Sequence, residues 1–144
     1  MTVVDSETEG AVRKFIARIP VDLPVERVLL YGSRARGDHG RDSDADVAVI
    51  LRRGAGDWKL LWMLSGLAYD VFVDTGIMIQ PVPVSSLDWA DPDGFPRPSF
   101  LRNVAREGIQ LSRTIPSPYF SFERANGRYR LRDSVWKTKI RTAR

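Results

Sequence analysis

Residues 30–51 read LYGSRARGDHGRDSDADVAVIL, and this stretch decides the fold. An apolar run at 28–30 stops before Gly32, which is the pattern of a buried strand that enters a tight turn. A second apolar run, at 47–51, is rich in β-branched residues and suits an interior strand. The stretch therefore predicts a strand, a tight turn at Gly32-Ser33, a short helix, a loop, and a second strand that opens with two alternating carboxylates.

Two acidic residues begin this second strand. Asp44 and Asp46 are two positions apart, so their side chains project from the same face of a strand. Proteins commonly hold Mg²⁺ with one or two carboxylates together with the phosphates of a substrate. The pair is therefore predicted to bind Mg²⁺ and to be catalytic.

The turn before the acidic pair has the features of a phosphate-binding corner. Gly32 lets the backbone approach a ligand closely, and free N–H groups at the start of a helix favour an anion. The hydroxyl of Ser33 can donate a hydrogen bond to a phosphate oxygen, and Arg34 or Arg36 can neutralise its charge. An Asp-rich loop alone is typical of a solvated turn, but motif order, flanking strands and spacing together favour a site for a nucleoside triphosphate and its metal.

At these residues the sequence resembles the nucleotidyltransferase superfamily, whose fold is polymerase-β-like. The motif of that superfamily is Gly-Ser, ten residues and then Asp-x-Asp, which Gly32-Ser33 with Asp44 and Asp46 match. From about the first helix to Leu111, the chain is similar to the minimal nucleotidyltransferases (MNT), which are often encoded beside a HEPN-domain partner. The resemblance implies an antitoxin that transfers AMP from Mg-ATP onto a tyrosine of a HEPN ribonuclease toxin.

One position departs from the family pattern. Many relatives carry a third carboxylate on the next strand, where it helps to bind metal or to activate the acceptor, and the aligned residue here is Gln80. An amide oxygen coordinates Mg²⁺ weakly and cannot act as a general base near neutral pH. Either two acids suffice, or another group substitutes, or activity has been lost. Asp70 and Asp74 are the nearest substitutes, but both are typical of solvated charges at a helix end.

Composition and charge bound the remaining possibilities. The 144-residue chain has no cysteine, which excludes a disulfide framework and a thiolate metal site. No apolar run is long enough to span a bilayer, and the first residues lack the features of a secretory signal, so we expect a cytoplasmic location. Residues 1–112 carry a net charge of −3 and residues 113–144 carry +7. We predict a nucleotidyltransferase domain at 1–112 and a basic, aromatic-bearing extension at 113–144.

Apolar periodicity predicts three further helices, at 7–19, at 57–73 and, capped by Ser99, up to Gly108. Asp57 is the predicted N-cap of the second of these, and Gly76 its predicted C-cap. Ser6, with a glutamate three residues later, forms a capping box at the start of the first of them.

Trp58 and Trp62 lie near the start of the second of these helices. They either form a partner surface or pack into the core, and we favour the core because helix aromatics more often pack inward. Residues 76–84 predict a third strand that either lies at a sheet edge or leaves the sheet irregularly, since its prolines cannot donate to a ladder. Residues 88–98 read as a proline-rich surface connection, and residues 109–111 as a short strand.

The extension at 113–144 interleaves aromatic with basic residues. Such a pattern either binds RNA or an acidic partner, or belongs to a tail that is partly disordered or folded on its own domain. We favour the tail, because no recognised nucleic-acid motif is present. His39, the single histidine, is expected at the surface, and further soft ligands for a zinc site are lacking.

The sequence as a whole predicts an α/β (α+β) sandwich, a small mixed sheet flanked by helices. Our first hypothesis is an enzyme in which Mg-ATP binds at Ser33, Asp44 and Asp46 and an acceptor hydroxyl displaces pyrophosphate from the α-phosphorus. The second, which Gln80 favours, is an antitoxin that neutralises its HEPN partner by binding alone. A third, nucleotidyl transfer to a small molecule such as an aminoglycoside, ranks last because the chain is too short for the substrate-binding domain those enzymes append.

Overall fold

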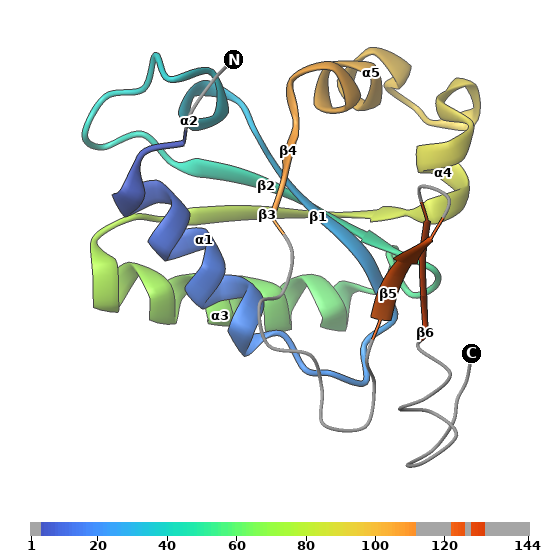
Figure 1. Cartoon of the computed structure of the whole chain (residues 1–144), viewed down its shortest axis with the longest axis horizontal. Helices are drawn as coiled ribbons and strands as arrows, with labels where there is room; N and C mark the ends of the chain where they lie inside the picture. The colour runs from blue at the N-terminus through green and yellow to red at the C-terminus, as the bar shows by residue number, and fades with distance from the viewer. Residues whose placement is uncertain (1–3, 112–121, 126–127, 132–144) are drawn as a thin grey trace. The chain divides into compact units, whose positions relative to one another are not determined.

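Four strands form one mixed sheet in the order β3-β2-β1-β4 (Figure 1). The computed structural model describes residues 4–111, 122–125 and 128–131, which belong to two units, Met1–Ser112 and Arg113–Arg144. The elements of the first unit are, in chain order, α1 (Ser6–Arg18), β1 (Val25–Tyr31), α2 (Ser33–Arg36), β2 (Ala45–Leu51), α3 (Trp58–Thr75), β3 (Ile79–Ser85), α4 (Ser86–Ala90), the 3₁₀ turn Pro92–Gly94, α5 (Pro98–Glu107) and β4 (Ile109–Gln110).

The pairing of the strands fixes the register around the predicted motif. β1 runs antiparallel to β2 and to β4, whereas β2 and β3 are parallel. Tyr31 on β1 and Gln80 on β3 are both register partners of Asp46. β3 lies at the sheet edge, so the edge position predicted from its prolines is confirmed.

The two faces of the sheet are covered by different helices. One face, which includes Leu30 and Val47, packs against α1 and α3. The other face, which includes Leu29 and Ala48, packs against α5, chiefly through its Leu101. Figure 1 shows α1 and α3 on one side of the sheet and α4 and α5 on the other. The predicted fold class, a mixed sheet with flanking helices, is confirmed.

The first helix begins one residue earlier than the capping box predicted. Its N-cap is Asp5, whose carboxylate accepts hydrogen bonds from both the backbone N–H and the hydroxyl of Thr8 at 2.8 Å. Ser6 is the first helical residue, so its assignment as the cap was wrong. A carboxylate outcompetes the neighbouring serine here because it also lies near His39 and Arg34, two basic side chains.

We expect Asp5→Ala to lower the free energy of unfolding by about 1 kcal/mol at neutral pH. Burial acts to raise the pKa of Asp5, but the hydrogen bonds from Thr8 and the charges of His39 and Arg34 outweigh it and hold that pKa below 3.8. The ionised carboxylate therefore stabilises the fold above pH 3.8, and this contribution disappears as the pH falls through the lowered pKa. Urea unfolding at neutral and acidic pH measures the effect; a cost that persists unchanged in acid would contradict this account.

The other helices match the predictions in part. Asp57 caps α3 and Gly76 ends it in the left-handed conformation with φ 79°, both as predicted. The interpretation of Trp58 and Trp62 as core residues was wrong, because their side chains are 63% and 70% exposed.

Two errors concern the segment before β4. The connection predicted at 88–98 overlaps a helix, α4, whose start is capped by the hydroxyl of Ser85. α5 begins at Pro98, after Arg97, and not after Ser99. Proline suits the first turn of a helix because its missing N–H has no partner there. Of the short strand predicted at 109–111, Ile109–Gln110 is present as β4.

In the second unit, β5 (Phe122–Ala125) and β6 (Arg128–Leu131) form an antiparallel pair. Phe122, Arg124, Arg128, Tyr129 and Arg130 belong to these two strands, and the other aromatic and basic residues of the extension lie outside the described residues. None of the described helices is long and apolar enough to cross a membrane.

Candidate active site

The acidic pair lies on the face of the sheet that α5 covers. Side chains alternate between the two faces of a strand, so Asp46 lies on the same face of β2 as Ala48 and Ile50, which pack against α5. Asp44, two residues before Asp46, continues this alternation just before the strand begins. Gln80 is the register partner of Asp46, and its Nε2 donates a hydrogen bond to Asp44 Oδ2 at 3.1 Å. The two predicted metal ligands and Gln80, at the third-acid position, are therefore neighbours at one end of the sheet.

The glycine of the turn is packed directly against this acidic pair. Gly32 has φ 78°, and a Cβ built on it would lie 2.4 Å from Asp46 Oδ2. Any larger residue would push the carboxylate away, so the glycine is required both for the turn and for the position of Asp46. The hydroxyl of Ser33, the next residue, lies at the same cavity and forms no hydrogen bond within the described part of the chain.

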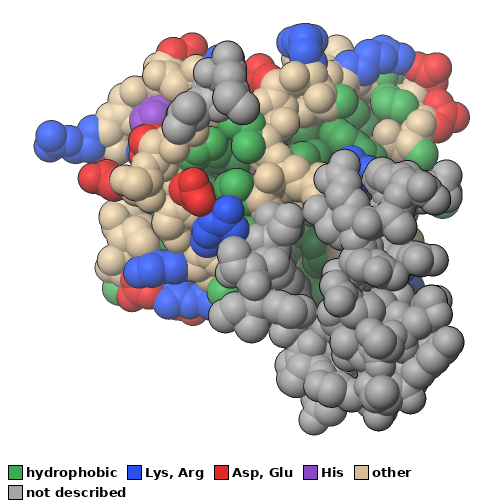
Figure 2. Space-filling model, in the orientation of Figure 1, with side chains coloured by type: hydrophobic (Ala, Val, Ile, Leu, Met, Phe, Trp, Pro, Cys, Tyr) green, Lys and Arg blue, Asp and Glu red, His purple; other side chains and the backbone are tan. Residues whose placement is uncertain are grey.

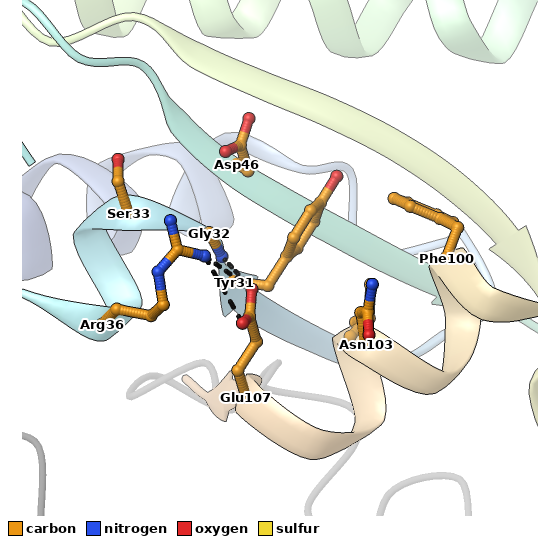
Figure 3. A pocket seen from close by; sticks show the side chains of 9 residues that line it. Tyr31, Gly32, Ser33, Arg36, Asp46, Phe100, Asn103 and Glu107 are labelled. Carbon is orange, nitrogen blue, oxygen red and sulfur yellow. Dashed lines mark hydrogen bonds and ion pairs between the residues drawn. The ribbon is translucent and has the colours of Figure 1, made fainter. Parts of the chain in front are cut away.

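Glu107, at the end of α5, completes the site. Its Oε1 accepts a hydrogen bond from the backbone N–H of Gly32 at 2.9 Å and lies 3.2 Å from Arg36 Nη1 (Figure 3). The backbone N–H of Gly32 is therefore held by a carboxylate of the chain itself and is not free for an anion. Arg36 also pairs with Asp38, and because it is exposed, its guanidinium can exchange these partners for a ligand.

A cavity of about 370 Å³ opens among these groups. One part of its wall is polar and the other is aromatic and apolar (Figure 3). Its lining residues are Tyr31, Gly32, Ser33, Arg36, Asp46, Phe100, Asn103, Val104 and Glu107. The rings of Tyr31 and Phe100 meet edge to face with their centroids 5.6 Å apart. A cavity of this size, with an apolar wall and a few charged groups, suits a small ligand that is polar at one end.

The electrostatics of the cavity favour a cation beside the acids. Burial, followed by the neighbouring charge of Asp44, raises the pKa of Asp46, which means that the ionised pair is under repulsion. Burial and the charge of Asp46 raise the pKa of Tyr31 to about 12, so its phenol keeps its proton at neutral pH. Within the described residues no group of three acidic, histidine or cysteine side chains gathers for a metal. Two carboxylates suit Mg²⁺ when a substrate phosphate supplies further ligands.

Arg34, which was predicted to neutralise phosphate charge, instead holds the loop between α2 and β2 in place. Its side chain is 4% exposed and donates to the backbone carbonyls of Ser43 at 2.8 Å and Arg41 at 3.0 Å. A third donor, Nη1, lies 2.7 Å from the Thr8 hydroxyl on α1. Because all three guanidinium nitrogens are occupied, we leave Arg34 out of the proposed phosphate contacts and retain Arg36.

We expect Arg34→Lys to lower the free energy of unfolding by about 2 kcal/mol. A lysine keeps the charge but has one nitrogen in place of three, so at least one partly buried carbonyl of the loop loses its partner. Denaturation in urea measures the change, with Arg53→Lys, an exposed arginine, as the control. Equal stability of the two variants would show that the hydrogen bonds of the Arg34 guanidinium group do not hold the loop.

His39 lies in the same loop, on the side of α1. Its Nε2 is 3.2 Å from Asp5 Oδ2, and its buried Nδ1 has no hydrogen-bond partner within the described residues. The side chain is 20% exposed, so it is less open than a surface histidine (Figure 2, purple). It lines no part of the cavity and we assign it no role there.

Sequence reasoning missed the part of the site that comes from α5. Glu107 and Asn103 belong to a segment that resembles the end of minimal nucleotidyltransferases, but nothing in its pattern pointed to the glycine turn. The substitutes considered for a third acid lie elsewhere. Asp74 pairs with Arg18, and Asp70 is exposed on α3, which covers the opposite face of the sheet.

Residues 12–80 match the family model of the nucleotidyltransferase domain. The matched segment runs from α1 to Gln80, and it contains the glycine–serine turn and both acids. The small mixed sheet with its flanking helices is the polymerase-β-like nucleotidyltransferase fold. Residues 12–80 therefore match a nucleotidyltransferase domain, as the motif predicted.

The solved structures that match this chain include toxin–antitoxin complexes. A mutant of the toxin–antitoxin MntA–HpeT is 18% identical with a TM-score of 0.50, over 74% of this chain and 73% of that one. A toxin–antitoxin with AMP-PNP is 23% identical with a TM-score of 0.49, over 74% and 73%. A tri-AMPylated HEPN toxin of Shewanella oneidensis with its MNT antitoxin gives 17% and 0.45, over 74% and 71%. No curated protein sequence matches the chain.

Proposed function

We propose that this chain is an MNT-type antitoxin that transfers AMP from Mg-ATP to a hydroxyl, a tyrosine of a HEPN ribonuclease toxin. The observation that carries the proposal is the packing of Gly32 against Asp46, with Ser33 and Asp44 beside them. It brings the glycine–serine turn and Asp46, one acid of the nucleotidyltransferase motif, to one cavity. The tyrosine acceptor and the HEPN partner rest on the resemblance of the motif to minimal nucleotidyltransferases.

Different residues around the cavity would bind different parts of a nucleotide and its metal. Asp44 and Asp46 would hold Mg²⁺, which when bound neutralises charge on the transferred phosphate and on the departing pyrophosphate. Ser33 donates a hydrogen bond to a phosphate oxygen, and Arg36 exchanges its exposed ion pairs for phosphate. Tyr31 remains a hydrogen-bond donor because its pKa is about 12.

In the proposed reaction the acceptor oxygen forms a bond to the α-phosphorus while the bond between the α- and β-phosphates breaks. Pyrophosphate leaves on the opposite side of the phosphorus. The acceptor hydroxyl gives up its proton to water or to a carboxylate of the pair, because the amide of Gln80 cannot take it. Most of the rate increase comes from positioning and from charge neutralisation.

Intact mass analysis tests the proposal. The chain is co-expressed with a HEPN-domain toxin, and the purified toxin is weighed and its modified residue located. One or more added AMP groups on tyrosine are expected, and they should be absent when both Asp44 and Asp46 are replaced by Asn. A toxin that stays unmodified while the chain also fails to bind ATP with Mg²⁺ would overturn the proposal.

A second candidate, inhibition of the toxin by binding alone, is favoured by the hydrogen bond between Gln80 and Asp44. This hydrogen bond occupies one oxygen of Asp44, a proposed metal ligand. In addition, Gln80 is a neutral amide at the position where many members of the family that the motif resembles carry an acid. Recovery of an unmodified toxin in a tight complex, with nucleotide still bound, would support this candidate over transfer.

We expect Gln80→Glu to raise the rate of AMP transfer about tenfold, because a carboxylate beside the acid pair can take the acceptor proton. The matched control is Gln80→Asn, which keeps an amide but shortens it and should not accelerate transfer. Initial rates of AMP incorporation measure the difference. An unchanged rate in the Glu variant would mean that acceptor activation is not what limits this chain.

A further inference from the structure

α3 carries a large apolar face that nothing in the described chain covers. Its inner side, which includes Leu60 and Leu64, is buried against the sheet and α1. On the outer side, six large apolar side chains are between 40% and 70% exposed: Trp58, Leu61, Trp62, Tyr69, Phe72 and Val73. A monomeric protein rarely exposes so many large apolar side chains together, so this face indicates a docking surface.

The exposed residues are arranged symmetrically about the middle of the helix. The centre is Ser65-Gly66, two small exposed residues, and a Cβ built on Gly66 would meet no atom within 4 Å. Trp62 lies three residues before this centre and Tyr69 three residues after it. Small residues between two aromatic positions allow two helices to approach closely while the rings pack on either side.

The outer pairs of residues follow the same symmetry. Trp58 precedes Ser65 by seven residues, and Val73 follows Gly66 by seven. With about 100° of rotation per residue, all of these side chains fall on one stripe of the helix. The stripe has apolar residues at equal distances on either side of its centre. It can therefore pack against the same stripe of a second copy that runs antiparallel to it.

The two edges of the stripe are also self-complementary. Lys59 and Asp70 lie along one edge, and Leu61 and Phe72 along the other. Consider two copies of α3 that run antiparallel and are related by a two-fold axis at the centre of the helix. Measured along the helix axis, Lys59 of one copy then lies within about 3 Å of Asp70 of the other. Leu61 and Phe72 meet in the same way on the opposite edge. Neither Lys59 nor Asp70 forms an ion pair within the described residues.

We propose that the chain forms a two-fold symmetric dimer in which the α3 helices of two copies pack antiparallel about Ser65-Gly66. The exposed parts of the six apolar side chains amount to on the order of 700 Å² per copy, close to the roughly 800 Å² per partner of a stable interface. Charge favours the same arrangement, because it forms two Lys59–Asp70 pairs. α3 lies across the sheet from the cavity, so the dimer leaves the proposed active site open.

Sedimentation analysis of the full chain at increasing concentration tests the dimer. We expect dimers at micromolar concentration, and a dissociation constant raised about 30-fold or more by Trp62→Arg, because a buried tryptophan at the centre of an interface is a binding hot spot. Leu87→Arg, at an 80% exposed apolar residue on α4, is the matched control and should leave the dimer intact. Circular dichroism confirms that both variants are folded.

A charge-exchange cycle tests the antiparallel register. Lys59→Glu and Asp70→Lys should each weaken the dimer roughly fivefold to tenfold, because each change places like charges together twice. The double variant should restore wild-type affinity, which a change that merely disturbed α3 would not do.

The absence of cysteine allows a direct test of the centre. Ser65→Cys should form an intermolecular disulfide under mild oxidation, while Ala90→Cys, at an exposed position on α4, should not. A full chain that stays monomeric up to several hundred micromolar, or a dimer that Trp62→Arg and the charge variants leave unchanged, would overturn the proposal. In that case residues 112–144 or a different protein cover this face.

Discussion

Asp46→Asn is expected to lower the rate of AMP transfer about 1,000-fold while the protein remains folded. The substitution removes one of the two carboxylates proposed to hold Mg²⁺ and leaves an amide of nearly the same shape. Incorporation of AMP into a HEPN toxin, followed by intact mass, measures the loss. Calorimetric titration with Mg²⁺ and a non-hydrolysable ATP analogue tells whether the cation or the nucleotide is no longer bound.

The stability of the same variant separates chemistry from folding. Because burial and the charge of Asp44 raise the pKa of Asp46, the folded state disfavours the ionised form relative to the unfolded state. Removing that charge should therefore leave the free energy of unfolding at neutral pH unchanged or slightly higher. Asp42→Asn, in the exposed loop just before the pair, is the control for activity. Transfer at the wild-type rate by the Asp46 variant would exclude this carboxylate from the reaction.

Gly32→Ala is expected to have the second largest effect, with transfer reduced about 100-fold. Its methyl group would lie 2.4 Å from Asp46 Oδ2 and, at φ 78°, the alanine itself would be strained. The carboxylate has to move, and a displacement of about 1 Å at a reacting centre costs about two orders of magnitude in rate. Strain and collision together should lower the free energy of unfolding by about 2–3 kcal/mol.

Gly37→Ala is the matched control for this substitution. Gly37 also has a positive φ, 88°, but a Cβ there meets no atom within 4 Å. This variant should lose only about 1 kcal/mol of stability from the backbone conformation and keep its activity. If the two alanine variants transfer AMP equally well, the contact between Gly32 and Asp46 has no role in the reaction.

The central motif was predictable because its information is local. A glycine–serine turn between two apolar runs, and acids at strand spacing, indicate their geometry through backbone preferences and side-chain alternation alone. The same reasoning located α3 and both of its caps, Asp57 and Gly76, although the helix ends at Thr75 and not at residue 73. It failed at the start of α5, where Pro98 begins the helix and the serine after it does not act as the cap.

The rest of the site depends on contacts between distant parts of the chain. Glu107 reaches the backbone of Gly32 across 75 residues because α5 packs on the same sheet face as the acids. Arg34 looked like a phosphate ligand until the fold brought Thr8 and the motif loop around it. The assignment of Trp58 and Trp62 to the core failed because periodicity cannot tell which side of an apolar helix meets the sheet.

The amino-acid sequence by itself determined the glycine–serine turn, the acid pair on one strand face and the class of fold, since each follows from neighbours a few residues apart. Only the tertiary structure decided which arginine remains available at the cavity, which carboxylate holds the turn, and which face of α3 is left uncovered. The physical reason is that these depend on side chains far apart in sequence competing for the same hydrogen bonds and the same buried surface.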